Sequence, residues 1–93
     1  MVKHIVCMKF RHSEDAVTAR EKLLALMGKV PSLRSMEVGL DFMHSARAYD
    51  LVLISTYDDR AGLDAYTNHP EHKKVQEYIH GVREGVVSVD FEF

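Results

Sequence analysis

Side chains with acid–base potential lie in two parts of the chain. His72 follows Tyr66 by six residues, on the far side of the Asn68-His69-Pro70 segment, and His4 lies near the N-terminus. An imidazole titrates near neutral pH and can take a proton from an activated carbon. A phenol can donate a hydrogen bond to a carbonyl oxygen as negative charge develops on it. These residue types therefore predict proton transfer on a carbonyl compound, provided that the fold brings them together.

Each candidate also has a purely structural explanation. A partly buried His72 could hydrogen-bond a backbone carbonyl, Tyr66 could be an ordinary aromatic core residue, and His4 could be an edge residue. His69 precedes Pro70, where capping of a helix is favoured over catalysis. Although His69 and His72 are three residues apart, no carboxylate or cysteine completes a ligand set at familiar spacing. We therefore expect no metal site and no cofactor.

The elements that position these residues follow from the spacing of the apolar side chains. Apolar residues alternate with other residues in four segments, which is the period of a strand. The predicted strands are residues 2–10, 36–42, 49–57 and 87–93.

Three- and four-residue spacing of apolar side chains predicts three helices. The first starts at Ser13 and ends near Gly28, a short second starts at Asp58 or Asp59, and the third runs from Pro70 to before Gly85. Ser13 and one of the two aspartates are the expected caps, and Pro70 suits a first helical position.

The predicted order, β-α-β-β-α-α-β, is typical of an α+β domain with a ferredoxin-like architecture: a four-stranded antiparallel sheet with helices on one face. His4 alternates with side chains that we place under the helices, so we expect it to meet His72 across a cleft. Tyr49, Leu51 and Leu53 share one side of the third strand, and we expect them to line the same cleft.

Composition limits the class of protein. Ninety-three residues fit one domain, residues 1–93, and 46% hydrophobic residues are enough for a packed core. Twelve basic against 14 acidic residues, with no basic run, argue against a nucleic-acid partner. The apolar runs are too short for a membrane span, and the lone Cys7 and the absence of a secretory signal predict a cytoplasmic protein.

The face of the sheet away from the helices is also apolar. Ile5 and Cys7 on the first strand, and Val52 and Ile54 on the third, point to this side. Because such a contiguous patch is larger than monomers usually expose, we expect a homodimer packed sheet to sheet. A monomer that leaves this apolar face exposed to solvent is the less favoured alternative.

Several segments carry a family resemblance: Val2-Lys3-His4-Ile5-Val6, Val38-Gly39, Tyr49-Asp50-Leu51-Val52-Leu53, Tyr66-Thr67-Asn68-His69-Pro70-Glu71-His72 and Val89-Asp90-Phe91. Together they resemble the stress-responsive A/B barrel (Dabb) family, over nearly the whole chain. The resemblance implies a dimeric α+β barrel in which each subunit keeps a cleft between its sheet and its helices.

Members of this family differ in role, since many are uncharacterised bacterial proteins and some plant members are stress-associated. One branch contains polyketide cyclases that catalyse an intramolecular aldol condensation. The resemblance implies that His72 and Tyr66 match the acid–base pair of that branch and that His4 matches its early histidine. Leu51 stands where that branch has a further histidine, so the full polar set is absent.

Three functional hypotheses follow. In the first, the chain is a cofactor-independent cyclase or lyase for a small, apolar carbonyl compound, with His72 as base, Tyr66 as electrophile and His4 sharing the proton. In the second, a stress-associated or ligand-binding dimer uses the same residues only to shape a hydrophobic cleft. The third, by similarity to other dimeric barrels, is a cofactor-free monooxygenase.

Overall fold

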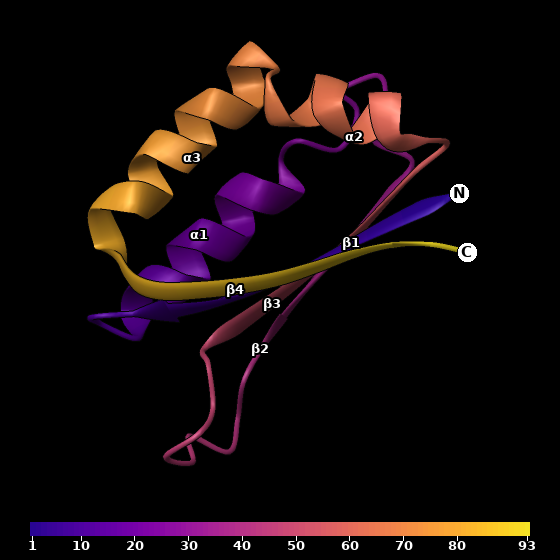
Figure 1. The fold of residues 1–93 in the computed structure, drawn as a ribbon. Helices are drawn as coiled ribbons and strands as arrows, with labels where there is room; N and C mark the ends of the chain where they lie inside the picture. The colour runs from indigo at the N-terminus through magenta and orange to yellow at the C-terminus, as the bar shows by residue number, and fades with distance from the viewer.

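A four-stranded antiparallel sheet lies beneath three helices in the computed structural model, which describes residues 1–93 (Figure 1). The elements are β1 (Val2–Phe10), α1 (Glu14–Leu24), β2 (Ser35–Leu40), β3 (Leu51–Tyr57), α2 (Arg60–Thr67), α3 (Pro70–Val82) and β4 (Arg83–Glu92). The predicted order of elements and the predicted α+β class are confirmed. None of the helices combines the length and the hydropathy needed to cross a membrane.

The sheet has the strand order β2-β3-β1-β4, so β1 lies between β3 and the edge strand β4. Along β1, Val6 pairs with Leu53 of β3, and His4 pairs with Ser55 of β3 and with Asp90 of β4. Because side chains alternate along a strand, these residues all point to the face that the helices cover.

The core fills the space between this face and the helices. Buried side chains from β1 and β3 meet Ala19 and Leu23 of α1 and Val75 and Ile79 of α3. Tyr66, at the end of α2, is also part of this cluster and is only 1% exposed. The core therefore holds α2 and α3 against the helix-covered face of the sheet.

Caps explain why α2 and α3 begin where they do. The Asp59 carboxylate accepts a hydrogen bond of 2.8 Å from the backbone N–H of Gly62, as predicted for one of the two aspartates. His69 caps α3, since its Nδ1 accepts from the backbone N–H of Glu71 at 3.1 Å. Ser13 occupies the N-cap position of α1, as predicted, but its side chain makes no capping hydrogen bond.

The predicted boundaries of four elements are also corrected. The first helix ends at Leu24 and continues as turns to Gly28, which has a φ of 85°. The third strand begins at Leu51 instead of residue 49, and the second spans Ser35–Leu40. The fourth begins at Arg83, directly after α3, so that Gly85 lies inside a strand and does not follow a helix end. A glycine is a helix-stop signal in the sequence, but here pairing with β1 decides the structure.

Candidate functional site

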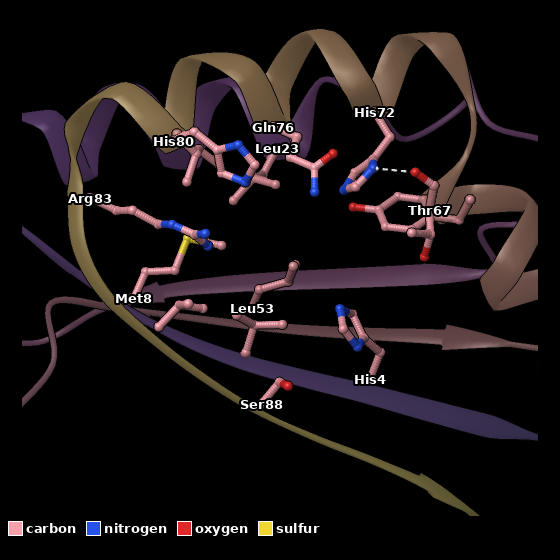
Figure 2. Close-up of a pocket in the computed structure, with 14 residues that line it drawn as sticks. His4, Met8, Leu23, Leu53, Thr67, His72, Gln76, His80, Arg83 and Ser88 are labelled. Carbon is pink, nitrogen blue, oxygen red and sulfur yellow. Dashed lines mark hydrogen bonds between the residues drawn. The ribbon is translucent and has the colours of Figure 1, made fainter.

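A cavity of about 230 Å³ lies between α3 and the helix-covered face of the sheet (Figure 2). Its apolar walls come from β1, β3, β4, α1 and α3, and consist of Val6, Met8, Leu23, Leu53, Ile79 and Val86. Its polar side chains include the three sequence candidates His4, Tyr66 and His72. The fold thus brings to one cavity three candidates that lie up to 68 positions apart in the chain.

His72 is half-buried on the cavity wall, near the start of α3. Its Nδ1 lies 3.0 Å from the backbone carbonyl oxygen of Thr67 (Figure 2). Because a carbonyl oxygen can only accept, Nδ1 carries the hydrogen and a neutral ring leaves Nε2 as a free acceptor. Burial lowers the pKa of His72, an effect that the Thr67 carbonyl partly opposes and that the neighbouring His4 and Lys73 reinforce. The ring is therefore neutral at pH 7 and can take a proton.

Tyr66 packs against His72, with 4.4 Å between the two ring centroids. Its hydroxyl is buried and has no hydrogen-bond partner in the protein. Burial raises the pKa of this phenol, so the hydroxyl keeps its proton and remains a donor. Since the oxygen atom has almost no accessible surface, a ligand atom reaches it only after a small shift of neighbouring side chains.

His4 lies on the sheet side of the cavity, with the side chain of His72 on the helix side (Figure 2). The His4 Nδ1 hydrogen-bonds the Asp90 carboxylate on β4. A carboxylate accepts from this nitrogen, so it orients the ring and leaves Nε2 without a protein partner. Asp90 was not predicted. Alternation places it on the helix-facing side of the last strand, but its contact with His4 depends on β1 and β4 being neighbours.

The three residues expected to line the cleft from β3 are not all found there. Leu53 lines the cavity, whereas Leu51 and Tyr49 do not. Leu51 is buried one step further along β3, opposite Met8. Tyr49 precedes β3, does not follow its alternation, and borders a groove that includes Cys7. The expectation that Tyr49 and Leu51 line the cleft is therefore corrected.

Gln76, His80 and Arg83 also line the cavity and were missed. A signal for the first two exists in the sequence, because His72, Gln76 and His80 recur at four-residue spacing and so lie on one side of α3. Arg83 has no such signal, since its orientation depends on the pairing of β4. No group of three or more His, Cys, Asp or Glu side chains is arranged to hold a metal ion.

Solved structures share this fold over almost the whole chain. A dimeric protein of unknown function with a ferredoxin-like fold from Bacteroides fragilis is 30% identical, with 99% of this chain and 95% of that chain covered and a TM-score of 0.83. A dimeric ferredoxin-like protein of unknown function from Thermobifida fusca is 25% identical, with 99% and 90% covered and a TM-score of 0.86. The predicted ferredoxin-like fold is thereby confirmed.

A hydroxynitrile lyase from Passiflora edulis is 16% identical, with 97% of this chain and 90% of that chain covered and a TM-score of 0.82. At this identity, the likeness concerns the fold alone. No curated protein matches the sequence. The model of the stress responsive A/B barrel domain, Dabb, matches residues 2–93, and the chain therefore belongs to this family.

Proposed function

We propose that this chain binds a small, largely apolar carbonyl compound in the cavity and moves a proton on it without a cofactor. The observation that supports this most directly is the buried Tyr66 hydroxyl, a donor with no acceptor in the protein, packed against His72. A buried polar group without a hydrogen-bond partner lowers the stability of the fold by about 1–3 kcal/mol. A ligand that supplies an acceptor for the hydroxyl would remove this penalty.

The proposed reaction is an intramolecular aldol addition or its reverse. Nε2 of His72 takes a proton from a carbon next to a carbonyl group while the Tyr66 hydroxyl donates a hydrogen bond to that carbonyl oxygen. The carbanion attacks a second carbonyl of the same molecule, forming a carbon–carbon bond and an alkoxide. The imidazolium then returns its proton to the alkoxide, so that no oxidant or reductant is needed. The Asp90 carboxylate orients His4, which lies on the sheet side of the cavity, opposite His72.

The cavity suits a small ligand. Its volume of about 230 Å³ is below the ~300–1,000 Å³ of typical drug-sized sites. Its apolar walls favour a hydrocarbon or aromatic body, and its histidines and tyrosine offer a few polar contacts.

Binding without catalysis is a second candidate, and two contacts favour it. The backbone carbonyl of Thr67 already satisfies Nδ1 of His72, and the Tyr66 hydroxyl is closed to solvent in this conformation. Under this alternative both residues serve as a packed wall of a hydrophobic ligand site.

A thermal-shift screen followed by product analysis separates the two candidates. The probes are aromatic ketones, linear polyketide-like triketones and quinols, because a ligand that binds only the folded state raises the melting temperature. Catalysis predicts stabilisation and turnover, with turnover reduced ~10²–10⁴-fold by His72→Ala. Binding without catalysis predicts stabilisation alone. No stabilisation by any probe class contradicts both.

We also propose that the chain forms a homodimer through the face of the sheet that the helices leave uncovered. Ile5, Cys7, Val52 and Ile54, predicted for this face, are only half-buried. β4 adds Val87, Val89 and Phe91, which are 50%, 62% and 41% exposed. Apolar surface of this extent across three adjacent strands is typical of an interface, and the two proteins compared above at 25–30% identity are described as dimeric.

A further inference from the structure

We infer that the ligand of this cavity carries a carboxylate and that Arg83 binds it, at the end of the cavity away from His72. This inference rests on the proposed function and extends it to a substrate class: a carbonyl compound with an apolar body and an acid group at its far end. Figure 2 shows the side chain of Arg83 extending into the cavity beside Met8 and below His80, with His72 and Thr67 at the other end.

A β-bulge aims Arg83 into the cavity. β4 pairs with β1 so that Gly85 faces Lys9 and Arg83 faces Phe10, which leaves Glu84 as an extra residue. Regular alternation from Val86, which lines the cavity, would have turned Arg83 to the outer face of the sheet. The extra residue returns it to the side of the buried Phe10. Bulges often re-aim a side chain in this way next to functional sites.

The charge of Arg83 is not balanced by the protein. Arg83 forms none of the ion pairs in the structure, and none of the residues lining the cavity is acidic. A guanidinium group stays charged at any physiological pH, so a half-buried one without a partner favours an anionic ligand. Its planar fork of N–H donors matches a carboxylate in bidentate geometry. Because Arg83 is the one permanent cation of the lining, a singly charged carboxylate balances it better than a phosphate dianion.

Neighbouring side chains complete such a site. Gln76 and His80, on the turns of α3 above Arg83, also line the cavity and offer N–H donors. Leu53 lies between the two ends of the cavity in the view of Figure 2. A ligand that reaches both ends therefore crosses an apolar stretch, which fits an aromatic or short aliphatic body with polar groups at its two ends.

A matched pair of probes tests the inference: 4-acetylbenzoate, a ketone with a carboxylate at the far end, and the neutral isostere 4-acetylbenzamide. Calorimetric titration of the unaltered protein is expected to show at least about tenfold tighter binding of the acid, the effect of one charge-assisted contact. Arg83→Gln is expected to remove this preference, so that acid and amide bind with equal affinity. The melting temperature and far-UV circular dichroism of the variant verify that it is folded. Arg83→Lys should keep part of the preference.

Arg20→Gln is the matched control, since Arg20 is exposed on α1 and does not line the cavity. This variant makes the same change in net charge and should keep the full preference for the acid. Equal binding of acid and amide by the unaltered protein, or an unchanged preference in Arg83→Gln, overturns the inference and leaves the proposed function standing. Failure of both probes to bind overturns the inference and counts against the proposed function as well.

Discussion

The groups around His72 have opposing effects on the pKa of its imidazole ring. Burial disfavours the imidazolium, and positive charge on His4, Lys73 or His69 does the same, whereas the Thr67 carbonyl favours it. Burial dominates, so the pKa of the folded protein lies below the ordinary value of 6.5. A base with this property remains unprotonated over a wider range of pH than a free histidine.

This lowered pKa predicts a loss of stability on acidification. Between the folded pKa of His72 and the unfolded value of about 6.5, the unfolded chain binds more protons than the folded one. The free energy of unfolding is therefore expected to fall as the pH drops below about 6.5 and to level off below the folded pKa. Urea denaturation between pH 7.5 and 5 measures this decrease, and His72→Gln should make it smaller.

His80→Gln provides the control for this experiment, because His80 is an exposed histidine of the same helix. The decrease in stability on acidification is expected to be smaller in His72→Gln than in His80→Gln. An unaltered profile in His72→Gln would contradict the assignment of a buried, neutral imidazole.

The two buried tyrosines make a second prediction at the residue scale. The Tyr66 hydroxyl has no partner, whereas the Tyr57 hydroxyl donates to Oγ of the buried Ser55 at 3.0 Å. Tyr66→Phe should leave the free energy of unfolding unchanged or raise it by about 1 kcal/mol, because it removes an unsatisfied group. Tyr57→Phe should lower it by about 1 kcal/mol or more, because it breaks a bond and leaves Ser55 unpaired. Chemical denaturation measures both.

The same pair separates chemistry from packing. If the Tyr66 hydroxyl contacts the ligand, Tyr66→Phe should weaken turnover or ligand binding without loss of stability. A Tyr66→Phe variant that is destabilised by more than 1 kcal/mol would instead indicate a hidden partner for this hydroxyl and a structural role.

At the scale of elements, the two residues at the starts of α1 and α2 are expected to differ in their contribution to stability. Asp59 caps α2 through Gly62, but Ser13 makes no capping bond to α1. Asp59→Ala is expected to lower the free energy of unfolding by about 1 kcal/mol. Ser13→Ala should change it by less than about 0.5 kcal/mol, as for other exposed surface sites. Equal losses in the two variants would show that the cap of α2 contributes nothing specific.

Elements with strong local signals were predictable from the sequence. β1 was expected over residues 2–10 and is found at Val2–Phe10, because its alternation is uninterrupted. Pro70 and His69 mark the start of α3 by their fixed backbone and capping preferences. The placement of His4, Tyr66 and His72 around one cavity also followed from periodicity, since each lies on the buried face of its own element.

Features that depend on pairing between distant segments were not predictable. The start of β4 at Arg83 and its bulge require the register of β4 on β1, which no local pattern of residues specifies. The contact between His4 and Asp90 requires the same register. Tyr49 was predicted to lie in the third strand, but β3 starts two residues later. Tyr49 therefore does not follow the alternation of the strand and does not line the cavity.

At the scale of the whole molecule, the proposed interface predicts that a single charge prevents self-association. Val52 lies near the middle of the uncovered face, between Cys7 and Gly39 in the register of the sheet. Val52→Asp places an unpaired carboxylate in a dry interface, which costs several kcal/mol, and should convert a dimer to a monomer. Light scattering after size-exclusion chromatography measures the mass directly.

Val17→Asp is the control for this substitution, because Val17 is 46% exposed on α1, a helix that covers the other face of the sheet (Figure 1). It adds the same charge and should leave the dimer intact. A monomeric mass for the unaltered protein would disprove the proposed interface.

The alternation of side chains along β4 links the cavity to the uncovered face. Val86 and Ser88 line the cavity, whereas Val87 and Val89 point to the outer side, and β4 is held to the sheet only by β1. If the proposed interface and ligand site both form, a ligand that shifts β4 would change the outer surface, and contact with a second copy would change the cavity. Thermodynamic reciprocity predicts that such coupling makes ligand affinity depend on protein concentration, and that added ligand changes the dimer dissociation constant by the same factor.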